Sequence, residues 1–280
     1  MEGKILRRLQ RIWIAALALS VSAWGMAATV AEPISPVGGQ DQYRLLRLER
    51  QITRWHTDVS GPAVVRYAFL DKERRFPGAR NCGGMQPPEL LRARSGITHE
   101  VLAREMSKAA RQWEQVANIR FVEAENENHA SLLIGAQTKP TGRAFTNVEL
   151  SEPAGSAPRS ISRALICLNP QMHWKIGFDG DLESYDLRYT LAHELGHAIG
   201  LDHPGPTGQL MGFRYTEAFD TLQPGDIAGA VALYGKPVPS VAQAVAARVA
   251  PHDALTRHDG NDMPQARAQS LALGETGVGR

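Results

Sequence analysis

The sequence predicts an α+β domain over residues 55–235, in which a twisted mixed sheet packs against helices. Three observations lead to this prediction. A strand pattern is followed by a long amphipathic helix, several short strands come next, and two further helical segments end the region. Hydrophobic residues make up 43% and charged residues 21% of the chain, as in globular proteins, and about 180 residues are ample for one hydrophobic core.

The elements of this domain can be assigned from local signals. Thr98 is a good N-cap for a helix from His99 to Val116, because apolar residues recur there at helical spacing. The segment 141–159 contains Ser, Pro and Gly and is expected to be a loop. Short apolar runs are expected to be strands: 63–70, 119–122, 131–135 and 164–168. Asp186 or Ser184 would start the next helix, which runs to about Ile199, and a last helix covers 226–234.

The segment from His193 to His203 carries the strongest chemical signal in the chain. On a helix, His193 and His197 lie four residues apart on one face, where two imidazoles can hold one Zn²⁺. Glu194 lies at the rim of that face and could act as a general base. Gly200 favours the left-handed conformation that ends a helix, and the turn would bring His203 round as a third nitrogen. Three protein ligands with an open fourth position are typical of catalytic zinc.

This segment resembles the extended motif of the metzincin clan of zinc endopeptidases at every defining position. Met211 follows eight residues after His203, and this short spacing resembles the matrixins, the matrix metalloprotease family. Residues 110–121 and 222–235 also resemble that family, so the resemblance covers about residues 55–235. It implies a sheet with an active-site helix above a small lower subdomain that contains a methionine turn, the Met-turn.

The resemblance also implies roles for residues after the third histidine. Met211 would form an apolar floor under the zinc ligands, and Tyr215 would line the pocket for the substrate residue that follows the scissile bond. Asp226 would hydrogen-bond to the Met-turn. The ordinary preference for a carboxylate at a helix N-terminus explains an aspartate at this position equally well. The family usually has Pro-x-Tyr after the Met-turn. Residues 212–215 keep only the Tyr, so pocket preferences do not transfer.

Several features depart from the clan. Pro204 resembles the serralysins, yet no glycine-aspartate calcium repeats follow it. The second, structural zinc site of matrixins has no clear counterpart, and His129 and His173 are expected to be surface histidines. The acidic run 179–183 could offer oxygens to Ca²⁺, as matrixins commonly carry calcium, and solvated charge explains the run equally well.

The two ends of the chain differ from the domain. Residues 1–31 have the pattern of a secretory signal peptide, with four basic residues before an apolar stretch and cleavage expected after Ala28 or Ala31. Removing four basic residues and one acidic residue takes the net charge from +2 to −1. No basic arm then remains to bind nucleic acid. Residues 32–54 could be a short pro-segment, in which the charged stretch 43–55 is expected to be helical or disordered. Residues 236–280 are expected to be an Ala-rich, largely disordered tail.

The chain has two cysteines, Cys82 and Cys167, and export makes a disulfide between them the expectation. Closing a loop of that length would stabilise the fold by roughly 4 kcal/mol. The matrixin resemblance suggests an alternative, in which Cys82 ligates the zinc in a latent form. Its flanks and its position after the first strand differ from the family's propeptide motif, which favours the disulfide.

Together these features predict a secreted or periplasmic zinc-dependent endopeptidase. It would act as a monomer on protein or peptide substrates, with no stable membrane insertion after signal removal. The alternative is a non-catalytic, zinc-containing peptide-binding module of the cell envelope. Such a module would not need a general base, whereas this chain keeps Glu194 beside the three histidines.

Overall fold

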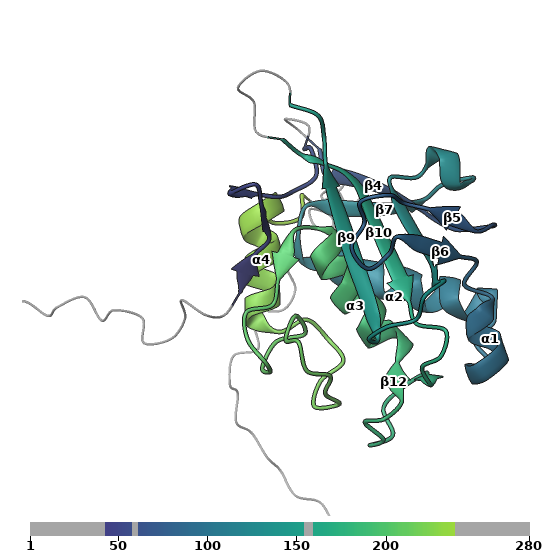
Figure 1. Ribbon diagram of the computed structural model, residues 1–280. Coiled ribbons are helices and arrows are strands. Elements are labelled where there is room, and N and C mark those ends of the chain that lie inside the picture. Colours follow the sequence, from purple (N-terminus) through teal and green to yellow (C-terminus); the bar gives the residue numbers. More distant parts are fainter. Residues whose placement is uncertain (1–42, 58–60, 154–158, 239–280) are drawn as a thin grey trace, which may run out of the picture. The chain divides into compact units, whose positions relative to one another are not determined.

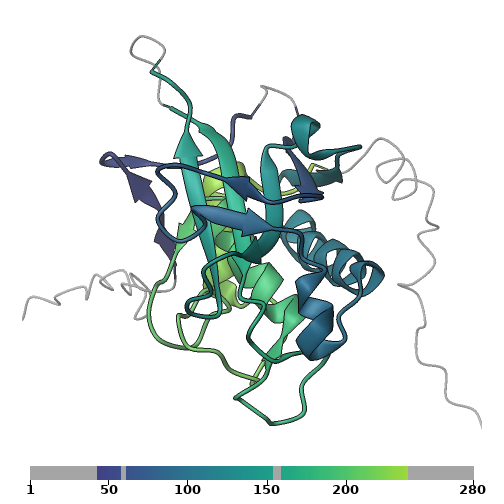
Figure 2. The same ribbon diagram turned by 45° about the vertical axis from the view of Figure 1, so that its right-hand side comes forward.

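The structure is a computed structural model that describes residues 43–57, 61–153 and 159–238. Within these residues one twisted sheet forms a layer, and two helices, α2 (His99–Val116) and α3 (Leu187–Ala198), pack on the same face of it (Figure 1, Figure 2). This arrangement confirms the predicted α+β class. The expected signal peptide, the segment 32–42 and the tail from 239 onwards lie outside the described residues.

Five strands form the body of the sheet, in the spatial order β7 (Ile119–Glu123), β4 (Ala63–Phe69), β8 (Leu132–Gln137), β10 (Ile161–Leu168) and β9 (Ala144–Leu150). Neighbouring strands run parallel, except that the edge strand β9 is antiparallel to β10. The sheet is therefore mixed, as predicted.

The other elements are short. They are β1 (Arg44–Leu45), β2 (Arg47–Leu48), β3 (Gln51–Ile52), β5 (Arg74–Arg75), β6 (Gly84–Gln86), α1 (Leu90–Ser95), η1 (Glu127–His129), β11 (Trp174–Lys175), β12 (Tyr185–Asp186) and β13 (Leu201–Asp202). The last helix, α4, covers Pro224–Tyr234 and so begins two residues earlier than predicted. None of the helices in the described ranges is long and apolar enough to cross a membrane.

Helix α2 follows from its sequence as predicted. The Thr98 side chain caps it by accepting a hydrogen bond from the Val101 N–H at 3.3 Å. Its apolar face is buried against α3, where the indole N–H of Trp113 donates to the Ala192 carbonyl at 2.9 Å. The long helix therefore provides a fixed support for α3.

The alternation of side chains along the central strands builds two hydrophobic clusters, one on each face of the sheet. In β8, Leu132 and Ile134 face the helices, whereas Leu133 faces the opposite side. On that opposite side a disulfide joins Cys82 to Cys167 of β10, and both residues are fully buried. The predicted pairing is thus confirmed, and the described chain contains no free cysteine that could ligate a metal.

Two of the predicted elements are wrong. The segment 141–159 is not a loop throughout, because residues 144–150 form β9, whose half-exposed side chains weaken the apolar pattern of a strand. The segment 43–55 is not helical or disordered, because it forms three short strands. One of them, β1, pairs with β13 just before His203, and an ion pair of 3.0 Å joins Arg44 to Asp202. Strand β9 depends on its pairing with β10 and β1 on its pairing with β13, and local propensity does not report such partners. Strands β2 and β3 pair with each other as a local hairpin.

Candidate active site

Helix α3 positions the first two histidines. Asp186 caps the helix, as its Oδ1 accepts a hydrogen bond from the Tyr189 N–H at 2.7 Å. The helix ends before Gly200, which has a φ of +106°. A Cβ at Gly200 would lie 2.1 Å from the Thr53 carbonyl oxygen, so only glycine fits the turn. The turn leads through β13 and returns the chain to the helix at His203, as predicted.

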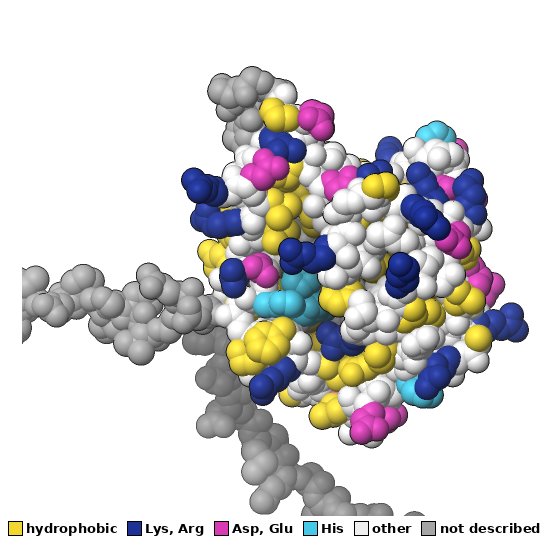
Figure 3. Space-filling model, viewed as in Figure 1, with side chains coloured by type: hydrophobic (Ala, Val, Ile, Leu, Met, Phe, Trp, Pro, Cys, Tyr) yellow, Lys and Arg dark blue, Asp and Glu magenta, His cyan; other side chains and the backbone are white. Residues whose placement is uncertain are grey.

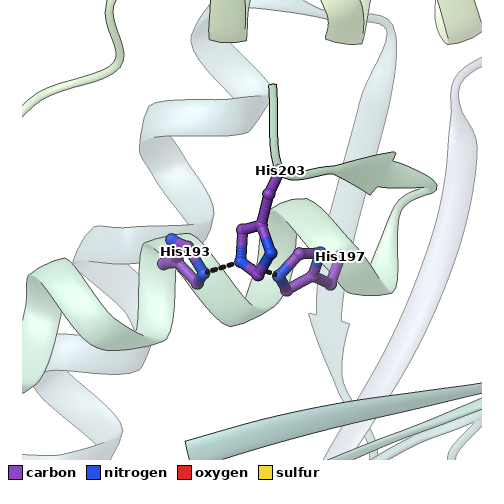
Figure 4. Close-up of side chains that lie close together, drawn as sticks. All are labelled: His193, His197 and His203. Carbon is purple, nitrogen blue, oxygen red and sulfur yellow. Dashed lines mark hydrogen bonds between the residues drawn. The ribbon is translucent and has the colours of Figure 1, made fainter. Parts of the chain in front are cut away.

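The three histidine side chains converge on one point (Figure 4). The Nε2 atom of His203 lies 3.1 Å from Nε2 of His193 and 3.1 Å from Nε2 of His197. His193 is only 2% exposed, and the other two histidines are half-buried at the edge of a cleft. No other group of His, Cys, Asp and Glu in the described ranges is arranged to hold a metal ion.

Backbone carbonyls fix the protonation of two of these rings. The Nδ1 atom of His193 lies 2.8 Å from the Leu210 carbonyl, and Nδ1 of His197 lies 2.9 Å from the Leu201 carbonyl. A carbonyl only accepts, so each Nδ1 must carry the proton, and each Nε2 keeps a free lone pair. These two nitrogens, with Nε2 of His203 beside them, are therefore available to ligate one metal ion.

The dimensions and charge of the cluster fit Zn²⁺. Zinc–nitrogen bonds of about 2.0–2.1 Å in tetrahedral geometry place ligand nitrogens roughly 3.3 Å apart, close to the two separations of 3.1 Å. Burial holds the pKa of His193 well below its usual value and lowers that of His203 to about 4. The rings are therefore neutral near pH 7, which is the form that ligates a metal.

Glu194 lies beside the cluster with its side chain turned into the same cleft. It is 3% exposed, and its Oε2 accepts a hydrogen bond from the Thr146 hydroxyl at 2.7 Å. Burial raises the pKa of Glu194, while the Thr146 hydrogen bond and the positive charge of Arg143 lower it in part. The result is a carboxylate with increased proton affinity next to the metal-binding nitrogens.

Met211, the residue predicted to form the Met-turn, lies against helix α3. It is 1% exposed, and a Cβ added to Gly196 of α3 would lie 2.2 Å from its sulfur. Asp226 accepts hydrogen bonds from the N–H groups of Leu210 at 2.8 Å and Met211 at 3.0 Å. The expected bond from Asp226 to this turn is therefore present. The Leu210 carbonyl in turn orients His193, so the turn controls one ligand directly.

The site opens into a cleft of about 570 Å³. Figure 3 shows histidine side chains reaching the surface on this face. Strand β9 forms one wall, Phe213 lies by His203 with 6.1 Å between ring centroids, and Leu46 and Leu48 of the N-terminal segment line another part.

The acidic run 179–183 already has a cationic partner. The Lys175 ammonium group contacts the Asp179 carboxylate, the Asp181 carbonyl at 2.6 Å and the Glu217 carboxylate at 2.6 Å. Calcium at this run stays a prediction that no contact supports. His129 and His173 are exposed, as expected.

Comparison with known proteins places these features in a family. A family model described as Matrixin matches residues 89–235, just over half of the chain. The chain belongs to the matrixin family. It is 28% identical to human stromelysin-3 over 158 residues, which cover 54% of this chain and 31% of that protein. It is 44% identical to mouse matrix metalloproteinase-19 over 63 residues, or 22% of this chain and 12% of that protein. The matches thus span less than half of either relative.

Membership places the chain in a family of zinc metalloendopeptidases, and this matrixin has the three-histidine cluster that could bind the zinc. Sequence reasoning missed two residues of its cleft, Thr146 and Arg143, because both lie in or next to β9. One signal could have found the strand: residues 144–150 include Phe, Thr and Val and contain neither Gly nor Pro. The predicted pocket residue Tyr215 is packed behind Arg143, and its role stays a prediction.

Proposed function

We propose that this matrixin is a secreted zinc-dependent endopeptidase in which Glu194 is the general base. One observation carries the proposal. Three histidine Nε2 atoms meet with two of the ring tautomers fixed for metal binding, and a buried carboxylate of raised pKa lies beside them in an open cleft.

The reaction would be hydrolysis of a peptide bond by water. His193, His197 and His203 would hold Zn²⁺, which would supply Lewis-acid activation of the water and of the substrate carbonyl. Glu194 accepts the proton of the water on its carboxylate and passes it to the leaving amine. Because Thr146 occupies Oε2, the other oxygen, Oε1, is free to take that proton. Met211 acts only as apolar support for the helix that carries the ligands.

Export and substrate class rest on further observations. The buried Cys82–Cys167 disulfide fits a protein that folds in an oxidising compartment, which agrees with the signal-peptide pattern of residues 1–31. The catalytic domain would cover about residues 55–235 and act as a monomer on proteins or peptides. The relatives named as metalloproteinase and stromelysin support this class of activity.

A non-catalytic peptide-binding module is the alternative reading. It gives no reason to bury an ionisable side chain at Glu194, since an unused buried carboxylate only costs stability. No contact in the described structure favours this alternative over the enzyme.

The test is cleavage of a mixed library of fluorescence-quenched peptides by the purified protein. Reactions with and without a zinc chelator run beside Glu194→Ala, with the exposed Glu183→Ala as a matched control. We expect chelation to abolish cleavage, Glu194→Ala to reduce it by about three orders of magnitude, and the control to be unaffected. Cleavage that survives Glu194→Ala would exclude this residue as the base. Zinc-loaded protein that cuts nothing would favour the binding module.

A further inference from the structure

Arg143 lies in the cleft beside the candidate zinc site with no partner of opposite charge. It lines the cleft together with His193 and Glu194. Its buried Nε atom has no hydrogen-bond partner, and no described residue forms an ion pair with its guanidinium group. An arginine left without an acceptor in a substrate cleft is unusual, because guanidinium groups in proteins normally pair with carboxylates or carbonyls.

Aromatic rings hold this guanidinium in place. Its central carbon lies 5.2 Å from the ring centroid of Tyr185 and 5.5 Å from that of Tyr215. Tyr215 cannot move away easily, since its hydroxyl accepts from the Asp186 N–H at 2.9 Å and donates to Glu217 at 2.8 Å. The cation is therefore fixed in position before any substrate binds.

The backbone under Arg143 is also fixed. Asn169 donates from its backbone N–H to the Arg143 carbonyl at 3.0 Å and from its side-chain amide to the Gly142 carbonyl at 2.6 Å. Asn169 is 3% exposed, and Gly142 has a φ of +56° that favours glycine. The placement of the Arg143 backbone thus depends on a buried residue that directly follows strand β10.

The carboxylates that line the cleft, Glu194 and Asp202, form no ion pair with Arg143, although the charge of Arg143 acts on Glu194 at longer range. Asp202 is paired with Arg44 at 3.0 Å, and Glu194 accepts the hydrogen bond of Thr146. A second arginine, Arg80, lines the same cleft and adds positive charge. The field in this part of the cleft favours an anionic group on the ligand.

Because Arg143 stacks on Tyr215, the residue predicted to line the pocket for the substrate residue after the scissile bond, we propose that Arg143 makes the cleft select peptides with a carboxylate side chain, Glu or Asp, at that position. The proposal rests on the endopeptidase function proposed above and adds a substrate class to it. The carboxylate would accept hydrogen bonds from the guanidinium group while its carbon chain packs on the aromatic rings. A leucine at that position would leave the Arg143 donors without acceptors, which costs binding energy.

The test uses quenched peptides that are identical except for Glu, Gln, Leu or Lys after the scissile bond. The wild-type protein should cleave the Glu peptide with a kcat/KM about ten- to a hundredfold above that of the Leu peptide, the range expected for one charge-assisted hydrogen bond. Arg143→Leu should abolish or reverse this preference, and Arg143→Lys should keep part of it. Arg120→Leu, which removes an exposed charge on β7, at the opposite edge of the sheet from β9, should change nothing.

A binding measurement separates this proposal from the peptidase itself. The same peptides are titrated into zinc-loaded Glu194→Ala protein, with and without Arg143→Leu, and followed by fluorescence polarisation. If the Glu peptide binds more tightly than the Leu peptide, and Arg143→Leu removes the difference, the selectivity is supported. This holds even if the wild-type protein cleaves nothing, in which case only the peptidase proposal fails. Efficient cleavage with an equal or better rate for Leu, or a Glu preference that survives Arg143→Leu, overturns the selectivity. If Arg143→Leu fails to fold, the wild-type ranking and the Arg143→Lys variant decide.

Discussion

The Thr146 hydroxyl lies 2.7 Å from Oε2 of Glu194 and 3.0 Å from the backbone carbonyl of the same residue. Thr146 belongs to the edge strand β9, whereas Glu194 belongs to α3. This contact therefore ties the edge of the sheet to the residue proposed as the general base. It fixes one of the two carboxylate oxygens of Glu194.

Replacing Thr146 by Val tests the value of this contact. The change keeps the shape of the side chain and removes one hydrogen bond to a carboxylate, which is worth about 1.5–3 kcal/mol when the acceptor is charged. We expect kcat to fall by at least about tenfold, because the substitution removes the contact that orients the base. KM should change little, because the substrate-binding site is left intact. Steady-state kinetics on one peptide measure both constants.

Thr190→Val is the matched control for this substitution. Thr190 is fully buried on α3, and its hydroxyl has no hydrogen-bond partner, so its loss should leave kcat unchanged and the fold at least as stable. Equal effects of the two substitutions would mean that the Thr146 contact has no specific role in catalysis.

The sequence predicted the ligand helix and missed the strand that supports the base, for a physical reason. His193, Glu194 and His197 lie within one helical turn of one another, so their spacing alone fixes their common face. Thr146 reaches Glu194 across 48 residues of sequence, and Arg143 reaches Tyr215 across 72. Such contacts depend on the pairing of β9 with β10, and an edge strand with half-exposed side chains gives a weak periodic signal.

Asp226 should be required for both stability and zinc affinity. Besides its bonds to Leu210 and Met211 it accepts from the Gln223 N–H at 2.8 Å, so three donors depend on one carboxylate that is 1% exposed. Asp226→Ala would leave these donors unsatisfied and should lower the free energy of unfolding by about 3 kcal/mol or more. It should also weaken zinc binding, because the Leu210 carbonyl that orients His193 loses its anchor.

Denaturant titration and chelator competition measure these two effects of Asp226→Ala. The control is Asp220→Ala, an exposed aspartate in the same connection. Unchanged zinc affinity in a destabilised Asp226→Ala protein would show that the turn supports the fold but does not tune the ligand.

Glu217 should make stability depend on pH in the acidic range. Burial alone would raise its pKa, but hydrogen bonds from Lys175, the Gly180 N–H and the Tyr215 hydroxyl outweigh this and lower the pKa to about 2. A carboxylate with a lowered pKa in the folded state contributes stability that is present above its usual value of 4.5 and is lost as pH falls from 4.5 towards 2. The melting temperature of the wild type should therefore fall more steeply over this window than that of Glu217→Gln.

Thermal melts for this comparison are made on metal-free protein, so that zinc release from the histidines does not contribute. If the melting temperatures of the wild type and of Glu217→Gln fall in parallel between pH 4.5 and pH 2, Glu217 is not a source of the acid sensitivity. Glu183→Gln, an exposed site in the acidic run, should follow the wild type.

Trimming the N-terminus should separate a pro-segment from a structural part of the domain. Removal of residues 1–42 leaves the contacts among the described residues in place. Removal up to residue 54 deletes β1, its pairing with β13 and the hydrogen bond of 2.8 Å from the Leu46 N–H to the Gly200 carbonyl, all next to His203. It also removes Leu46 and Leu48 from the cleft wall. We expect removal of residues 1–42 to keep full stability and activity, and removal of residues 1–54 to lower both. If removal of residues 1–54 instead raises activity, residues 43–54 are an inhibitory pro-segment.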